Sequence, residues 1–406
     1  MASIQDIALK RWFMGKGSRI KSVTEEDRVE IAGNAITIVR VTFTTNRPPD
    51  LYATVEDESR IGGILDKAFS KARFTVPAKH GKFIFERTSG FPARISAEAL
   101  DSIAPLDAEQ SNSAYVSKRF FFKLYRRLLP GIHPEAEIME HFGDIGYGGS
   151  PRLCGKCRYT DASGILYTLG ILESRCHGGT DAWAAFNKRM DERSAEALGK
   201  ATAKMHRALK GLPGTPAQNP EVPFDKLEKL LRTFKSDNEQ TQTLAVKLKA
   251  ALPELKKLAK FPKGAGALLP QRIHGDFHLG QVLVSADSTA DNKSPAFKIL
   301  DFEGEPSRTL EYRRALRSPA VDIAGMLRSF QYAGAVSDQN SAACEHAFIE
   351  GYARTAHMDA AALENDCTPY ILAKAVYEAC YELEFRPDWF HIPARALLNF
   401  LYLGAL

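Results

Sequence analysis

The chain has 406 residues, of which 44% are hydrophobic and 25% charged, and its formal net charge at pH 7 is +5. At roughly 150 residues per domain this is an ordinary globular protein of about two to three domains, which excludes collagen-like, disordered and small disulfide-stapled proteins. No apolar run approaches the ~18–20 residues that span a bilayer, and the start MASIQDIALKRWF lacks a secretory apolar stretch. We therefore expect a cytoplasmic protein that contacts neither membranes nor nucleic acid, because its basic residues are not clustered.

Residues 1–90 alternate β-like runs with turns and are expected to form a small α+β unit; the family resemblance given below implies that this unit is an N-terminal cap subdomain. Its expected elements are strands at 36–43, 51–55 and 82–86 and a helix at 61–70. Residues 91–175 continue as a β-rich lobe. Its expected elements are strands at 114–116, 120–124, 152–159 and 165–173 and a helix at 134–142.

Residues 176–406 switch to a helical pattern that is interrupted by one β-rich island at 272–301. The expected helices lie at 194–209, 225–235, 241–258, 319–332, 342–356 and 368–385. The chain as a whole is therefore predicted to be an α+β protein, with a β-rich part followed by a mostly α-helical part.

The β-rich island carries the side chains that phosphoryl transfer needs. Asp276 follows a glycine turn, Gln281 comes five residues later, and Asp301 ends an apolar strand. A carboxylate can orient an acceptor hydroxyl, and an amide with a second carboxylate can hold Mg²⁺ against phosphates. The alternative for this island is a zinc site formed by His274 and His278. Zinc is also an alternative at the CxxC motif of residues 154–157, but ordinary cysteines on a strand are favoured there.

The segments HGDFHLGQVL at 274–283 and KILDFEGEP at 298–306 resemble the catalytic core of the aminoglycoside-phosphotransferase-like kinases, within the protein-kinase-like superfamily. Bacterial maltokinases are the closer match. Their further resemblance lies in RWFMGKGSRI, EQSNSAYV, FKLYRRLLPGIHPEAEI, RSPAVDIAGMLRSFQYA and KAVYEACYELEFRPDWFHIP. The resemblance implies a bilobal, eukaryotic-kinase-like fold that uses ATP and Mg²⁺.

The resemblance also implies roles for residues outside the island. From the residues alone, Lys123 would be a surface lysine, but by resemblance it pairs with Glu137 and reaches the nucleotide phosphates. By resemblance, the polar turn at 110–113 is a loop that binds the nucleotide phosphates. Residues 172–175 are then the hinge between the two lobes, and their backbone contacts adenine. The candidate cofactor-binding residues are Lys123, Glu137, Ser111, Asn112, Ser113 and Glu173. Asp322 would support the catalytic turn.

The sugar is expected to contact the helical part. The candidate substrate residues are His278, Glu303, Glu378, Tyr381 and Trp389. Alternatively, Tyr377 and Tyr381 form a core stripe and the glutamates a solvated face.

Asp276 would be the catalytic residue, and Gln281 and Asp301 the metal ligands. The favoured function is the phosphorylation of maltose to maltose 1-phosphate, with a trehalose synthase as a candidate partner. The alternative is a kinase for another free sugar, such as glucosamine with a 6-phosphate product, and a nucleotide-binding pseudokinase is less favoured.

Overall fold

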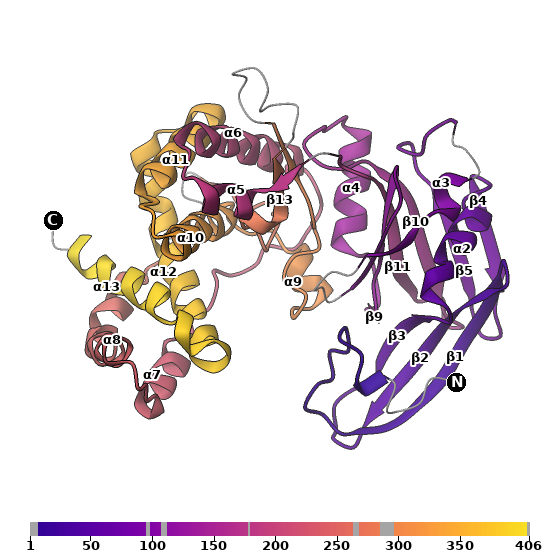
Figure 1. The fold of residues 1–406 in the computed structure, drawn as a ribbon, viewed down its shortest axis with the longest axis horizontal. Coiled ribbons are helices and arrows are strands. Elements are labelled where there is room, and N and C mark those ends of the chain that lie inside the picture. The colour runs from indigo at the N-terminus through magenta and orange to yellow at the C-terminus, as the bar shows by residue number, and fades with distance from the viewer. Residues whose placement is uncertain are drawn as a thin grey trace. The chain divides into compact units, whose positions relative to one another are not determined.

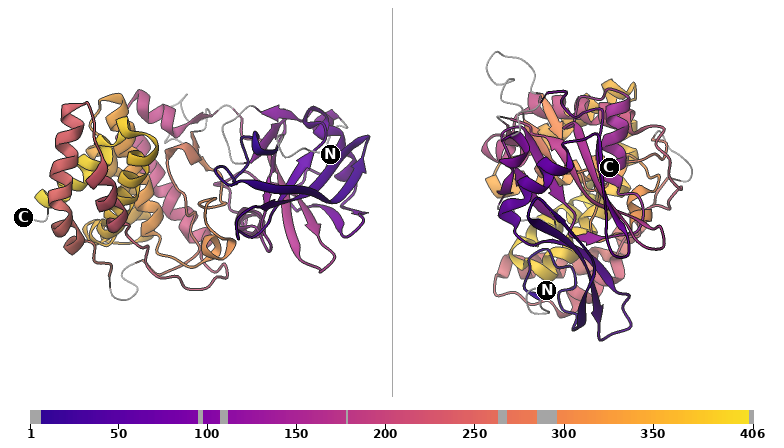
Figure 2. Two further views of the ribbon diagram at one scale, coloured as in Figure 1. Left: turned by 90° about the horizontal axis from the view of Figure 1, so that it is seen from below. Right: turned by 90° about the vertical axis from the view of Figure 1, so that its right-hand side faces the viewer.

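In a computed structural model of the protein, the structure describes residues 7–94, 98–106, 112–177, 179–262, 268–284 and 296–403. The chain divides into two compact units, Met1–His177 with Glu305–Arg313, and Gly178–Gly304 with Arg314–Leu406. Strands make up most of the first unit and helices most of the second (Figures 1 and 2). This is the α+β order that the sequence predicts.

The described residues of the first unit form two sheets. Its strands are β1 (Ile20–Ile31), β2 (Asn34–Phe43), β3 (Asp50–Val55), β4 (Arg73–Pro77), β5 (Lys82–Arg87), β6 (Ala104–Leu106), β7 (Ser113–Val116), β8 (Phe120–Leu124), β9 (Arg127–Leu128), β10 (Leu153–Thr160) and β11 (Leu166–Ser174). Among the described residues, one sheet has the order β1-β2-β3-β9 and the other β4-β5-β10-β11-β8-β7-β6. Its helical segments are η1 (Glu58–Arg60), α2 (Ile61–Ala68), α3 (Glu98–Asp101) and α4 (Pro134–Asp144).

Strand pairing crosses residue 90, where the sequence suggested a boundary between a cap and a lobe. Strand β5 pairs with β10 over six residue pairs, and β3 pairs with β9. The 1–90, 91–175 and 176–406 division remains a prediction, but the first two ranges share both of these sheets. Strand β1 was not predicted, because its sequence IKSVTEEDRVEI carries charges on its solvent-facing positions.

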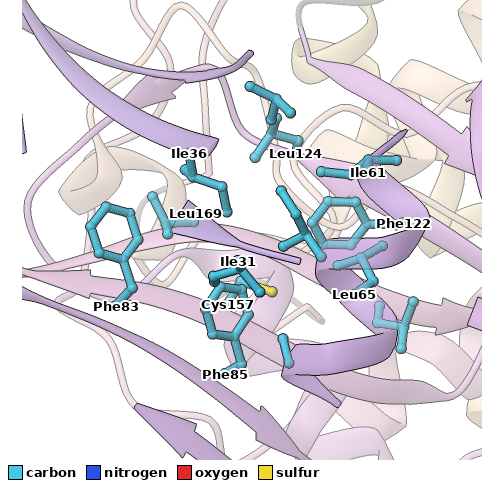
Figure 3. Packing of buried hydrophobic residues seen from close by; sticks show 14 of the residues in the cluster. Ile31, Ile36, Ile61, Leu65, Phe83, Phe85, Phe122, Leu124, Cys157 and Leu169 are labelled. Carbon is cyan, nitrogen blue, oxygen red and sulfur yellow. The ribbon is translucent and has the colours of Figure 1, made fainter. Parts of the chain in front are cut away.

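The core of the first unit draws side chains from both sheets and from α2. Figure 3 shows how these apolar side chains converge. The labelled members are Ile31, Ile36, Ile61, Leu65, Phe83, Phe85, Phe122, Leu124, Cys157 and Leu169. Each fully buried Leu, Ile or Phe adds roughly 1.5–3 kcal/mol relative to an exposed one, so this cluster fixes strand β8 and the polar residues that follow it.

The second unit is built on helices around a small three-stranded sheet. Its elements are β12 (Thr180–Asp181), α5 (Ala182–Lys188), α6 (Glu192–Leu209), α7 (Phe224–Thr233), α8 (Glu239–Leu258), η2 (Leu279–Gln281), β13 (Val282–Val284), β14 (Phe297–Ile299), α10 (Ala320–Ser337), α11 (Ala342–Ala356), α12 (Ala360–Phe385), η4 (Pro387–Trp389) and α13 (His391–Leu403). Helix α9 (Leu310–Arg314) belongs almost wholly to the first unit, because the segment Glu305–Arg313 is part of that unit.

Helices α6 and α11 lie side by side (Figure 1), and two glycines permit their close approach. A Cβ at Gly199 would lie 2.1 Å from the carbonyl oxygen of Phe348, and a Cβ at Gly351 would lie 2.1 Å from that of Glu196. No larger residue fits at either position without a shift of backbone. This contact brings His206 on α6 and Tyr352 on α11 within hydrogen-bond distance of each other.

Candidate active site

The catalytic turn of the second unit is held by one buried aspartate. Asp322, in the first turn of α10, is 0% exposed. Its Oδ2 accepts the His274 backbone N–H at 2.8 Å and its Oδ1 accepts the Gly275 N–H at 2.9 Å. Gly275 has φ +85°, a left-handed conformation that favours glycine. The carboxylate therefore fixes the backbone one residue before Asp276.

His274 has a defined tautomer. Its Nε2 lies 2.8 Å from the carbonyl oxygen of Leu300, and a carbonyl only accepts, so Nε2 carries the hydrogen. Nδ1 is then an acceptor, and the Asp276 backbone N–H points to it at 3.4 Å. The ring thus ties the turn to the end of β14.

A second histidine, His206, contacts the carboxylate of Asp322. His206 Nε2 lies 3.0 Å from Asp322 Oδ2, and its Nδ1 lies 2.9 Å from the Tyr352 hydroxyl. Burial raises the pKa of Asp322, but the hydrogen bond and charge of His206, with the Gly275 N–H, outweigh burial and leave that pKa below its usual value. Asp322 therefore stays ionised. Neither His206 nor Tyr352 was predicted from the sequence, because they lie on two other helices, far from Asp322 in the chain.

The two residues predicted to hold Mg²⁺ contact each other. Gln281 Nε2 donates to Asp301 Oδ2 at 2.9 Å, because Gln281 precedes β13 and Asp301 follows β14 at the same end of this antiparallel pair. Asp301 has φ +62°, a conformation that costs a non-glycine residue roughly 1 kcal/mol or more and is often found at functional sites. Amide and carboxylate oxygens are donors that suit Mg²⁺. Their role as ligands remains a prediction.

His278 lies close to the same charged groups. Its Nδ1 accepts the Gly280 backbone N–H at 3.1 Å and so caps η2. Burial lowers the pKa of His278; Asp276 raises it, and His274 and Lys374 lower it further. Its side chain is thus held in a fixed orientation as a neutral group. Glu303 is 5% exposed, and for both residues a contact with substrate remains a prediction.

Helix α12 turns Glu378 and Glu382 towards α10 and leaves Tyr377 and Tyr381 exposed. Glu378 Oε2 accepts from Nε of the buried Arg328 at 2.7 Å, and Glu382, which is 1% exposed, accepts the Tyr332 hydroxyl at 3.0 Å. The solvated face suggested as an alternative is therefore wrong. A buried carboxylate needs such partners, and α10 supplies both of them.

The aromatic residues of this region surround one arginine. Arg386 donates to both oxygens of Glu382, at 2.7 and 3.0 Å, and lies over the rings of Tyr381 and Trp389. Trp389 also stacks on Tyr332, with ring centroids 6.2 Å apart. Tyr377 and Tyr381 are 38% and 40% exposed, so they do not form a core stripe. The sugar contacts assigned to Glu378, Tyr381 and Trp389 remain predictions.

The first unit carries the lysine candidate. Lys123 on β8 is 6% exposed, so the expectation of a surface lysine was wrong. Its Nζ lies 3.0 Å from Glu135 Oε2, and the same oxygen accepts the Tyr125 hydroxyl at 2.6 Å. Glu135 lies in the first turn of α4, two residues before Glu137. The ion pair that the structure shows is therefore with Glu135, and the role assigned to Glu137 remains a prediction.

Of the predicted phosphate loop, Ser111 lies outside the described residues. The backbone N–H of Arg126 points to Asn112 Oδ1 at 3.4 Å. The side-chain Nε of Arg126 donates to Ser113 Oγ at 2.7 Å. Glu173 is buried near the end of β11, opposite Leu153. The contact of these residues with a nucleotide remains a prediction.

The cysteine pair of the zinc alternative lies on β10, where Cys154 and Cys157 are buried thiols. Burial raises the pKa of the Cys154 thiol to about 12, which disfavours the thiolate that binds metal. Within the described ranges, no three His, Cys, Asp or Glu side chains are placed so that they could hold one metal ion together. None of the helices in that part of the chain is long and apolar enough to cross a membrane.

Residues 102–356 match the model of a family described as the phosphotransferase enzyme family. A glucosamine kinase of Streptacidiphilus jiangxiensis is 29% identical over 229 residues, which cover 51% of this chain and 49% of the relative. The matched part thus spans about half the length of this curated relative.

Solved structures of glucosamine kinase share the fold. One, in complex with glucosamine, ADP and inorganic phosphate, is 20% identical, covers 97% of this chain and 98% of its own, and has a TM-score of 0.64. Another crystal form is 21% identical, covers 98% and 99%, and has a TM-score of 0.65. The predicted kinase-like α+β fold is confirmed.

Proposed function

The chain belongs to the phosphotransferase enzyme family, and from this premise we propose that it transfers the γ-phosphoryl group of ATP to a hydroxyl group of a small sugar. The single observation that carries the proposal is the buried Asp322, which fixes the backbone of the turn immediately before Asp276 through two hydrogen bonds. A carboxylate at a rigid position can orient an acceptor hydroxyl, and positioning accounts for most of catalysis in phosphoryl transfer.

In the proposed step, the acceptor oxygen forms a bond to the γ-phosphorus and the bond to the β,γ-bridging oxygen breaks. The hydroxyl proton passes to the carboxylate of Asp276. Gln281 and Asp301 would hold Mg²⁺, which supplies positive charge to the phosphates when bound. Their mutual hydrogen bond keeps the two side chains together.

Lys123 would neutralise phosphate charge. Its ion pair with Glu135 is buried on both sides, with side chains 7% and 1% exposed. Tyr125 also bonds Glu135 and stacks on His133, with ring centroids 3.8 Å apart. The carboxylate is therefore held from two directions, and the ammonium group keeps a fixed place at the end of β8.

We propose glucosamine as the first acceptor to test, because the curated relative and the solved structures of the same fold are glucosamine kinases. Its ammonium group would need a carboxylate. Glu378 and Glu382 already each accept from a guanidinium group, so the ammonium would share one of them. Glu378→Gln should then raise KM for glucosamine but not for glucose, which carries a hydroxyl in place of the ammonium.

Maltose is the second candidate, and the sequence resemblance of residues 11–20 and 374–393 to maltokinases supports it. Maltose carries no ammonium, so its phosphorylation would be insensitive to Glu378→Gln if that residue acts only through charge. The position of phosphorylation differs as well: the anomeric hydroxyl for maltose and the 6-hydroxyl for glucosamine. Product analysis by NMR separates the two.

The test is an ADP-release assay with Mg·ATP against glucosamine, maltose, glucose, trehalose and several aminoglycosides. Turnover of a sugar, lost by about 10²–10⁴-fold in Asp276→Asn while calorimetry still detects ATP binding, supports the proposal. Asp338→Asn, at an exposed position on the same unit, is the matched control. Full turnover by Asp276→Asn would contradict the role of Asp276. ATP binding without turnover of any sugar would favour the pseudokinase.

A further inference from the structure

Arg126 is a buried arginine at the junction of β8 and β9, and it is 1% exposed. Its Nη1 donates to the carbonyl oxygen of Ala53 at 3.2 Å. Its Nη2 donates to Glu58 Oε1 at 2.5 Å and to the Tyr115 hydroxyl at 3.2 Å. The guanidinium carbon also lies 5.1 Å from the ring centroid of Trp12. One side chain thus joins β3, η1, β7 and the N-terminal segment.

The same arginine holds the start of β7. Its Nε donates to Ser113 Oγ at 2.7 Å, and its backbone N–H points to Asn112 Oδ1 at 3.4 Å. These are the described residues of the predicted phosphate loop. Ser113 Oγ accepts from Arg126 and also makes a side-chain hydrogen bond with Tyr115, so the two residues together fix its orientation. Serine hydroxyl and asparagine amide groups can donate, and phosphate oxygens are acceptors.

We propose that Arg126 is a positioning residue for the nucleotide. It holds Asn112 and Ser113 in the orientation in which they meet phosphate, while its own charge is neutralised by Glu58 and does not contact the ligand. The inference rests on the proposed nucleotide-dependent function. It adds a second support to that function, through hydrogen bonds that are separate from those of the Lys123–Glu135 pair.

Only an arginine serves this role, because the bonds leave the guanidinium from three different nitrogens. A lysine at the position keeps the charge opposite Glu58 but has one nitrogen, which cannot reach Ser113, Ala53 and Glu58 together. Arg126→Lys should therefore release Ser113 while the ion pair persists. The ligand would then have to order the residues itself, which weakens its apparent affinity.

Arg127 is the matched control. Its Nε and Nη2 both donate to Asp50 Oδ1, at 3.1 and 2.8 Å, so it too joins the β8–β9 region to β3. Both of these bonds lead to Asp50, and neither involves Asn112 or Ser113. Arg127→Lys thus tests the general effect of weakening this junction.

The experiment measures KM for ATP, KM for the sugar, kcat and ATP affinity by calorimetry. In Arg126→Lys we expect ATP affinity to fall and KM for ATP to rise roughly five- to tenfold, with KM for the sugar unchanged and kcat within about twofold. Ser113→Ala, which should fold normally, should show the same direction. Arg127→Lys should leave every one of these constants unchanged.

A merely structural role would reduce the amount of active protein, and so kcat, without changing KM for ATP. That result, or an equal rise of KM in Arg127→Lys, would overturn the inference. If Arg126→Lys does not fold, unchanged ATP affinity in Ser113→Ala overturns it. If no sugar is turned over, the proposed function fails, but calorimetry with ATP still decides the role of Arg126.

Discussion

Replacement of Asp322 by Asn tests whether one buried carboxylate fixes the catalytic turn. The three groups around it, the backbone N–H of His274, that of Gly275, and His206 Nε2, lie 2.8, 2.9 and 3.0 Å away. If the asparagine oxygen accepts from His274 and His206, its amino group faces the Gly275 N–H. The N–H of Gly275 then has no acceptor, because both groups are donors. That loss costs about 1–3 kcal/mol, and the loss of charge on the remaining bonds adds about 1 kcal/mol.

We therefore expect Asp322→Asn to lower the free energy of unfolding of the second unit by roughly 2–4 kcal/mol. Because Gly275 precedes Asp276, the displaced turn should also lower kcat, by about 10-fold or more if it costs ~1.4 kcal/mol of the transition-state stabilisation. Urea titration and ADP release measure the two effects. Asp338→Asn is the control, since Asp338 is an exposed helix C-cap with φ +53°, where asparagine is well tolerated.

The pH dependence gives an independent check. The pKa of Asp322 is lowered in the folded protein, so the unfolded chain takes up the proton first as pH falls. The stability contributed by the ionised group is fully present above the ordinary aspartate value, about 4, and is lost as pH falls below it through the folded pKa. The difference in the free energy of unfolding between wild type and Asp322→Asn should stay constant from pH 7 to about pH 4 and narrow below that. A difference that does not narrow below that pH, or unchanged stability and kcat at pH 7, would refute the reasoning.

Three further predictions concern other parts of the molecule. Glu135→Gln should raise KM for ATP while α4 stays helical by circular dichroism, because Lys123 loses its buried counter-charge; an unchanged KM would count against the clamp. Gln281→Ala should raise the Mg²⁺ concentration needed for half-maximal activity, and an unaltered Mg²⁺ titration would remove Gln281 from the metal site. Phe85→Ala, at 1% exposure, should cost the first unit about 3–5 kcal/mol in thermal or urea unfolding, and a loss under 1 kcal/mol would place Phe85 outside the core.

Local patterns in the sequence were sufficient for the order of elements and for the candidate catalytic island. Alternation and helical spacing depend on neighbouring residues, so the β-rich part and the later helices followed from them, whereas the kinase-like fold was implied by the family resemblance. Asp276 and Gln281 lie five residues apart in the chain. The resemblance that their segment carries led to the phosphotransferase family that residues 102–356 match.

Only the tertiary structure decided which partners the charged residues have. Glu135 and Glu137 both lie in the first turn of α4, and packing against β8 brings Glu135 to Lys123. The inward direction of Glu382 depends on the Tyr332 hydroxyl of a different helix.

Contacts between residues far apart in the chain also depended on the tertiary structure. The donors to Asp322 come from residues 48 and 116 positions away in the chain, and β5 crosses the suggested boundary to pair with β10. A sequence pattern specifies the face and period of an element, because these depend on residues a few positions apart. The partner across a buried ion pair or a sheet depends on how the elements pack, and that is set by the whole fold.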